Sequence, residues 1–133
     1  MNILVVDDNP MNVMVVQEML KRSGYDSVIS AGSAAEMFAL LDSPEHKSTK
    51  LANQSSIDLI LLDLMMPEID GMEACRMLQR DERFRDIPVI IVTAIGDSRK
   101  LAEALDLGAT DYVTKPINKV ELLARIRSAL RLK

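Results

Sequence analysis

The chain has 133 residues, of which 48% are hydrophobic and 27% are charged, so its length and composition fit one soluble globular domain. Its formal net charge of −4 argues against non-specific nucleic-acid binding by this chain alone. The single cysteine, Cys75, excludes an intrachain disulfide, and no apolar stretch has the pattern of a signal peptide or the ~18 residues of a membrane span, so we expect a cytoplasmic protein.

Short apolar runs alternate with helical patterns along the chain. The apolar runs predict strands at residues 3–6, 27–31, 57–62, 88–93 and 110–114. The patterns between them predict helices from Asn9-Pro10 to near Gly24, from Ser33 through Leu41, from Gly71 through Leu78, from about Leu101 to near Gly108, and from Asn118 through Leu130. These βα units predict an α/β fold, a doubly wound parallel sheet with helices on both faces, in one domain over residues 1–133.

Residues 43–56 interrupt this alternation. They are polar, include Pro44 and show no periodicity, so we expect a loop that is long for a compact α/β domain. A tolerated surface insertion is the simpler interpretation, and a loop that contacts a partner is the alternative. The only histidine, His46, lies in this loop, and we interpret it as a solvated residue rather than as a phosphodonor.

Polar residues gather where the predicted strands end. The first strand is followed by Asp7 and Asp8, the third by Asp63, the fourth ends at Thr93, and the fifth is followed by Lys115. Each has an ordinary structural explanation when taken alone, such as a turn cap or a solvated lysine. Because the carboxyl ends of parallel strands meet at one edge of a sheet, we expect them to lie together.

This set of side chains suits phosphoryl chemistry. Neighbouring carboxylates repel one another, and a hard cation such as Mg²⁺ relieves that repulsion. An ammonium group and a hydroxyl beside a carboxylate could neutralise the oxygens of a phosphoryl group. A carboxylate can itself be the nucleophile, which would form an aspartyl-phosphate.

At these residues the chain resembles the CheY-like receiver domains of two-component response regulators. The matching stretches are I-L-V-V-D-D (3–8), L-I-L-L-D-L-M-M-P-E-I-D-G (59–71), V-I-I-V-T-A (89–94) and G-A-T-D-Y-V-T-K-P (108–116). The resemblance covers essentially the whole chain and implies a flavodoxin-like fold with five helices and five strands in the order 2-1-3-4-5.

The resemblance also implies how the acidic residues act. Asp63 would be the phosphoacceptor, taking a phosphoryl group from a sensor histidine kinase or a histidine phosphotransfer protein. Asp7 and Asp8 would hold Mg²⁺, with Mn²⁺ as a substitute, helped by Asp63 and the backbone carbonyl of Met65.

The remaining roles implied by the resemblance concern the phosphoryl group and the response to it. Lys115 would pair with the phosphoryl group, Thr93 would hydrogen-bond it and shift inward on activation, and the backbone N–H of Ala94 would contact it. Tyr112 would be the switch aromatic that turns inward as Thr93 moves, and the Lys115–Pro116 peptide would be cis.

Met65 and Ile95 lie two residues beyond Asp63 and Thr93, at positions where the family varies its phosphoryl lifetime. Both are apolar here and cannot position a water molecule through a polar side chain. We therefore expect slow self-dephosphorylation.

The function that follows is a phosphorylation-dependent signalling switch rather than an enzyme. Phosphorylation would change the face formed by the fourth helix, fifth strand and fifth helix, which would contact an output domain or a second copy in a homodimer. The basic ending, residues 122–133, is similar to that of receivers that continue into an output domain such as a diguanylate cyclase, so the chain is either stand-alone or part of a longer regulator. We expect no direct nucleic-acid or membrane partner.

Two alternatives use the same residues differently. A phosphohydrolase of the haloacid dehalogenase kind would need an acid–base residue two positions after its nucleophile, where this chain has Met65. A degenerate receiver would act as an unphosphorylated interaction module, and the complete set of site residues argues against it.

Overall fold

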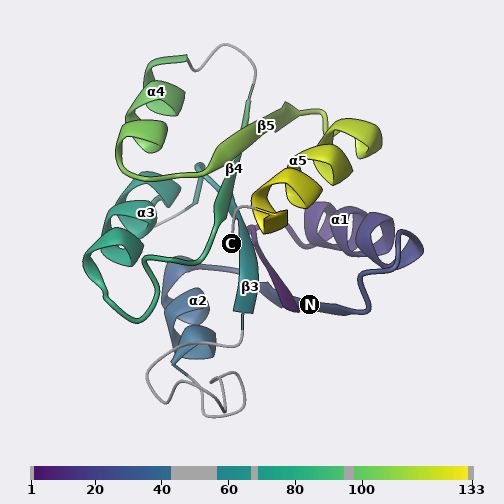
Figure 1. Ribbon diagram of the computed structural model, residues 1–133, viewed down its shortest axis with the longest axis horizontal. Helices are drawn as coiled ribbons and strands as arrows, with labels where there is room; N and C mark the ends of the chain where they lie inside the picture. Colours follow the sequence, from purple (N-terminus) through teal and green to yellow (C-terminus); the bar gives the residue numbers. More distant parts are fainter. Residues whose placement is uncertain (1, 43–56, 67–68, 95–97, 132–133) are drawn as a thin grey trace.

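A five-stranded parallel sheet forms the centre of the structure (Figure 1). The computed structural model describes residues 2–42, 57–66, 69–94 and 98–131. The strands are β1 (Asn2–Val6), β2 (Ser27–Ala31), β3 (Ile57–Asp63), β4 (Val89–Ala94) and β5 (Asp111–Lys115). Adjacent strands pair in parallel in the order β2-β1-β3-β4-β5, which confirms the predicted fold class and strand order.

The burial of each strand follows from its place in the sheet. β3 and β4 are unbroken apolar runs in the sequence, and almost all of their residues are buried. A central parallel strand has helices on both of its faces, so continuous apolar character is what burial there requires. β2 and β5 lie at the two edges and are mostly half-exposed, which explains their weaker apolar patterns.

Five helices connect the strands: α1 (Pro10–Arg22), α2 (Ala34–Leu41), α3 (Gly71–Arg80), α4 (Ser98–Asp106) and α5 (Lys119–Arg131). Asparagine side chains cap the N-termini of α1 and α5. Asn9 Oδ1 accepts a hydrogen bond from the Met11 N–H at 2.9 Å, and Asn118 Oδ1 accepts one from the Glu121 N–H at 3.1 Å. Such caps satisfy backbone donors that the first helical turn leaves without partners.

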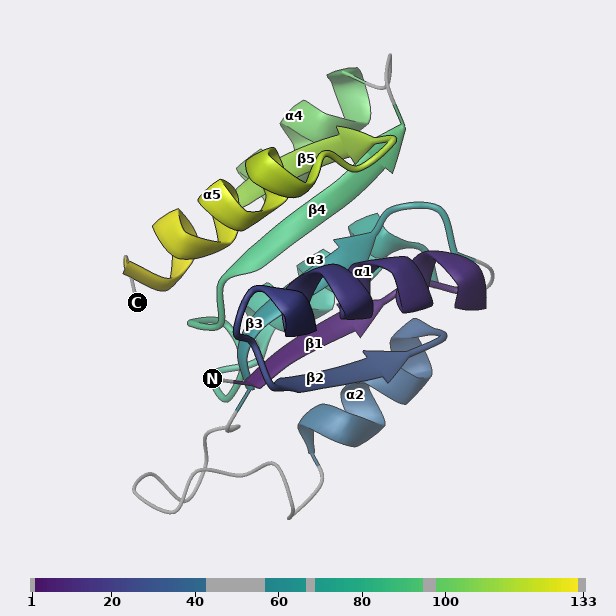
Figure 2. The same ribbon diagram turned by 90° about the vertical axis from the view of Figure 1, so that its right-hand side faces the viewer.

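The helices cover the sheet in two layers. Figure 2 shows α1 and α5 on one face and α2, α3 and α4 on the other. A core cluster with Leu20 and Ile126 lies under α1 and α5, and a second cluster with Met37 and Leu78 lies under the other three helices. Cys75 belongs to the second cluster and is buried.

Several elements differ by a residue or two from their predicted bounds. β3 extends through Asp63, so this residue is the last of the strand and not the first after it. β4 begins at Val89, and Pro88 only contributes its carbonyl oxygen, which accepts from the Ile60 N–H at 3.0 Å. Thr110 likewise precedes β5, and its side-chain Oγ1 accepts a hydrogen bond from the Val89 N–H at 3.2 Å.

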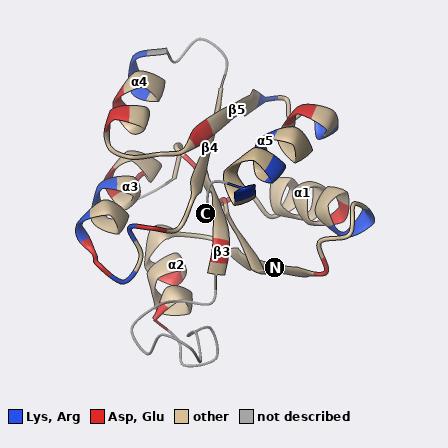
Figure 3. Cartoon of the chain, in the orientation of Figure 1, with Lys and Arg blue, Asp and Glu red and all other residues tan. Residues whose placement is uncertain are grey.

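Some predictions fall on residues outside the described part of the chain: the loop 43–56 with its histidine His46, and Ile95 after β4. In the described residues, no helix has the length and apolar character needed to cross a bilayer. Figure 3 shows Lys and Arg interspersed with Asp and Glu over the helices rather than gathered in one basic stripe.

Candidate functional site

The polar strand ends meet at one edge of the sheet. Asp7 directly follows β1, Asp63 ends β3, Thr93 lies near the end of β4, and Lys115 ends β5. Asp7, Asp63 and Thr93 are the buried polar or charged residues of the described chain, with 8%, 3% and 2% of their surface exposed. The parallel sheet thus holds three polar side chains in a desolvated edge, which costs free energy unless partners compensate.

The three aspartates form an acidic cluster. One carboxylate oxygen from each of Asp7, Asp8 and Asp63 lies within 4.8 Å of the others. The cluster is held in place from the backbone: Asp7 Oδ1 accepts from the Asn9 N–H at 2.9 Å, and Asp63 Oδ1 accepts from the Met65 N–H at 3.1 Å. This donor set of hard oxygens could hold a metal ion, and it fits a Mg²⁺-type cation.

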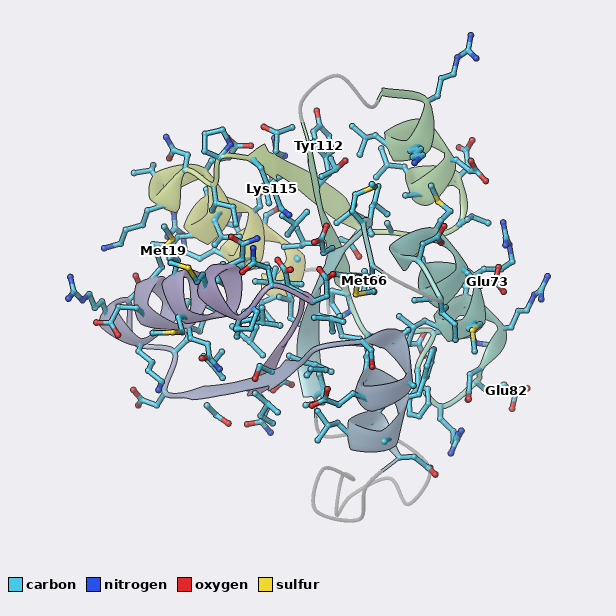
Figure 4. The ribbon with its side chains drawn as sticks, turned by 180° about the vertical axis from the view of Figure 1, so that it is seen from behind. Met19, Met66, Glu73, Glu82, Tyr112 and Lys115 are labelled. Atoms are coloured by element: carbon cyan, nitrogen blue, oxygen red, sulfur yellow. The ribbon has the colours of Figure 1, made fainter. Side chains whose placement is uncertain are left out.

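Lys115 provides a positive charge beside the same carboxylates. Its Nζ lies 3.2 Å from Asp63 Oδ2 and 4.0 Å from Asp7 Oδ2. Lys115 comes from β5 and Asp63 from β3, so the contact spans the intervening strand β4 at the sheet edge. Figure 4 shows Lys115 on β5, with its nitrogen directed toward the middle of the sheet.

The pKa of the Asp63 carboxyl is raised above its ordinary value. Burial is the largest cause, and the negative charge of Asp7 adds to it. The hydrogen bonds from the Met65 N–H and from Lys115 act in the opposite direction but do not cancel the effect of burial. A further cation at the cluster would therefore favour the ionised, nucleophilic form of Asp63.

Thr93 carries a polar atom without a partner. Its Oγ1 is buried and makes no hydrogen bond within the described structure. Such atoms are rare because an unsatisfied buried hydroxyl costs free energy. An oxygen-rich group bound against Asp63 would provide an acceptor for this hydroxyl, and the exposed Ala94 next to it keeps the approach open.

The turn after Asp63 is packed tightly against α3. The Gly71 N–H donates to the Leu64 carbonyl at 3.0 Å, and a Cβ at position 71 would lie 2.3 Å from the Asp63 carbonyl oxygen. Asp70 caps α3 by accepting from the Glu73 N–H at 2.9 Å. Only glycine allows this approach, so Gly71 fixes where the end of β3 lies relative to α3.

Tyr112 lies on the same face of the sheet as Thr93. Thr93 pairs with Thr114 across β4 and β5, and Tyr112 is two residues before Thr114, which places both side chains toward α3 and α4. Tyr112 is half-buried and packs on the core cluster of that face. The guanidinium carbon of Arg125, from α5, lies 5.3 Å from its ring centre.

The structure thus brings Asp7, Asp8, Asp63 and Lys115 into direct proximity. Thr93 and Ala94 lie on the neighbouring strand β4, and Tyr112 lies on the edge strand β5. Met65 follows β3 with its side chain exposed, and the Lys115–Pro116 peptide is cis, as the resemblance implies.

Sequence reasoning gave no role to two residues that the structure places at or near the site. Gly71 could have been found from the Asp70-Gly71 dipeptide, which is typical of a cap and a close backbone approach. Arg125 had no local signal, because its contacts depend on where α5 crosses β5.

Comparison with known proteins agrees with this geometry. The response regulator receiver domain family matches residues 3–127. The chain is 40% identical over 129 residues to the DNA-binding dual master transcriptional regulator RpaA of Synechocystis sp., covering 97% of this chain and 48% of that protein.

Solved structures give the same result. The receiver domain of a signal transduction histidine kinase from Syntrophus aciditrophicus is 31% identical with a TM-score of 0.82, over 98% of this chain and 89% of that one. A probable two-component system response regulator/GGDEF domain protein is 28% identical with a TM-score of 0.84, over 99% of this chain and 50% of that one. The chain spans about half or less of the length of the curated relatives that it matches.

Proposed function

Because the chain belongs to the response regulator receiver domain family, we propose that it is a phosphorylation-dependent switch whose phosphoacceptor is Asp63. The observation that carries this proposal is the place of the Asp63 carboxylate, buried at the end of β3 between Lys115 and two further acids. In the transfer, a carboxylate oxygen of Asp63 forms a bond to phosphorus. The phosphorus–nitrogen bond of a phosphohistidine donor breaks, and the histidine nitrogen keeps the electron pair.

The neighbouring residues have distinct roles in this transfer. Lys115 pairs with the phosphoryl oxygens that arrive at Asp63, and the Thr93 hydroxyl and the Ala94 N–H donate hydrogen bonds to them. The unpartnered Thr93 hydroxyl supports its part, since it has no other acceptor in the described structure. These are positioning and electrostatic tasks, which supply most of the catalysis in phosphoryl transfer.

Asp7, Asp8, Asp63 and the Met65 carbonyl would hold Mg²⁺ or Mn²⁺. When bound, the ion supplies positive charge that offsets the charge of the carboxylates and of the phosphoryl group. The proximity of the three carboxylates and the raised pKa of Asp63 support this assignment.

The donor is a sensor histidine kinase or a histidine phosphotransfer protein in the cytoplasm, and α1 offers a surface for it. Met11, Met14 and Val15 are exposed apolar residues in the first turns of α1, which begins beside the acidic cluster. A groove of about 270 Å³ between α1 and the Lys115–Pro116 turn, lined also by Val15, continues this surface. An exposed apolar patch of this kind is typical of protein contacts.

Phosphorylation changes the face formed by α4, β5 and α5. Thr93 moves toward the phosphoryl group, Tyr112 turns inward behind it, and the changed face contacts an output domain or a second copy. RpaA is described as DNA-binding, and another similar protein carries a GGDEF domain, so we propose that residues 1–133 are one receiver domain whose output lies in a linked domain or a separate partner. Its relatives are named as regulators, which favours a switch over a phosphohydrolase.

Intact-mass spectrometry after incubation with acetyl phosphate and Mg²⁺ tests the proposal. The parent should gain one phosphoryl group and Asp63→Asn none. Tandem mass analysis should place the group on Asp63 after reduction of the acyl phosphate. If the parent gains nothing from acetyl phosphate and does not bind beryllofluoride with Mg²⁺, the degenerate interaction module replaces this proposal.

A further inference from the structure

We propose that Arg125 is a positioning residue that holds Tyr112 in its observed place at the edge of β5 and so sets the balance of the switch. The proposal rests on the proposed function, because it concerns the movement of Tyr112. It assigns a regulatory role to a side chain of α5 that lies outside the phosphoacceptor site.

Arg125 is fixed from one side by acidic residues. Its Nη1 donates to both carboxylate oxygens of Asp111, at 3.0 and 2.9 Å, and its Nε lies 3.7 Å from Glu121 Oε1. Asp111 Oδ1 also accepts from the Tyr112 backbone N–H at 2.8 Å. The same carboxylate therefore ties the guanidinium to the backbone of the residue whose ring it covers.

The guanidinium reaches Tyr112 around the free edge of the sheet. α5 packs on the face that carries α1, whereas Tyr112 packs on the core cluster beneath α2, α3 and α4. β5 is the edge strand, with a partner only on the β4 side, so a side chain from α5 can pass its open side. Arg125 does so, with its guanidinium carbon 5.3 Å from the centre of the Tyr112 ring, within the range of a cation–π contact.

Tyr112 lies near the start of β5, three residues before Lys115 at the end of the strand, and Figure 4 labels both side chains. The ring is half-buried and lies on the same face as Thr93, whose hydroxyl is buried without a partner. When the ring turns inward behind Thr93, it leaves the guanidinium, while the Asp111 pair keeps Arg125 at the edge. The contact thus favours the observed arrangement over the inward one.

The size of this bias follows from the kind of contact. A partly exposed cation–π contact changes an equilibrium by about two- to fivefold. Removing the Arg125 charge should therefore lower, by about two- to fivefold, the concentration of a phosphoryl analogue needed to drive Tyr112 inward. The Arg125→Lys variant keeps a positive charge but loses the planar guanidinium that hydrogen-bonds Asp111. The analogue concentration that it needs should therefore lie between that of the parent and that of a variant without the charge.

The chain offers a direct probe, because it has two tyrosines, Tyr25 and Tyr112, and no tryptophan. Incorporation of 3-fluorotyrosine gives two ¹⁹F resonances, and Tyr25→Phe assigns them. Beryllofluoride with Mg²⁺ is then titrated into the parent, Arg125→Met and Arg125→Lys. Arg127→Met is the matched control, since the exposed Arg127 lies on the same helix and lines a separate groove with Tyr25.

We expect a lower titration midpoint for Arg125→Met, an intermediate one for Arg125→Lys and an unchanged one for Arg127→Met. An unchanged Tyr25 resonance shows that Arg125→Met is folded, and Asp111→Asn, which releases Arg125, should shift the midpoint in the same direction. Equal midpoints in the parent and Arg125→Met, with a clear Tyr112 response in both, overturn this inference alone. A parent that binds beryllofluoride with no Tyr112 response overturns the switch role of Tyr112 and this inference with it, while the phosphoacceptor role of Asp63 stands.

Discussion

Replacing Gly71 by alanine should disturb both the stability of the protein and the position of Asp63. The added Cβ would lie 2.3 Å from the Asp63 carbonyl oxygen and 2.6 Å from the Leu64 Cα, both of which are backbone atoms. Ordinary non-bonded contacts need about 3.5 Å, so α3 or the end of β3 must move by roughly 1 Å. Overpacking of this kind costs about 1–3 kcal/mol, which lowers Tm by roughly 3–6 °C for each kcal/mol in a domain of this size.

The displacement should also slow phosphoryl uptake, because a misplacement of about 1 Å at a reacting group costs up to about 100-fold in rate. Gly32→Ala is the matched control, since its Cβ would meet only the flexible Glu36 Oε2, at 3.4 Å. Urea unfolding and the initial rate of labelling by acetyl phosphate measure the two effects. If both variants unfold at the same urea concentration and label at the same rate, the close packing of Gly71 on Asp63 does not position the phosphoacceptor.

Three further perturbations test the electrostatics and the surfaces of the site. Burial raises the pKa of Asp63, so between pH 3.8 and this raised pKa the folded protein keeps a proton that the unfolded chain has lost. In metal-free buffer the free energy of unfolding should therefore fall as the pH rises from 3.8 through the raised pKa. Urea titrations at several pH values measure this fall, and Asp63→Asn should remove the contribution of Asp63 to it. Mg²⁺ at about ten times its Kd should raise the free energy of unfolding by about 1.4 kcal/mol, and Asp8→Asn should remove most of this gain; equal stabilisation of the parent and the variant would place the ion elsewhere. Met14→Glu should slow transfer from a phosphorylated histidine protein about tenfold by placing a charge in an apolar contact, with the rate from acetyl phosphate unchanged; a parallel loss from both donors would show damage to the site instead.

The gathering of the acidic residues at one edge was predictable from the sequence because it requires only that the strands be parallel. Apolar runs ending in Asp7 and Asp63 predict parallel strands, and parallel strands place their carboxyl ends together whatever the details of packing. The resemblance to receivers then supplied the strand order, which periodicity left open. Some observed strand ends differ by one residue from the predicted ones. The hydrogen bonds between adjacent strands decide where their pairing begins, and the bond from the Val89 N–H to Thr110 Oγ1 is one example.

The contacts of Gly71 and Arg125 could not be predicted in the same way. Each depends on the distance between two elements far apart in the chain: β3 against α3 in one case, and α5 against the edge of β5 in the other. Hydrophobic patterns show which face of an element is buried, but they do not give the spacing of packed elements to within the width of a methyl group.

The proposed switch needs a site that is rigid at the acids and responsive at the edge of the sheet, and the positions of the strands fit both needs. β1 and β3 have partners on both sides and carry the acids, so burial and hydrogen bonding fix the carboxylates before any ligand arrives. β5 has a partner strand on one side only. It carries Lys115, which contacts Asp63, and Tyr112, which packs on the core cluster beneath α2, α3 and α4. In the proposed switch, a change at Asp63 would reach the edge strand through Lys115, and an edge strand is where packing costs least to rearrange.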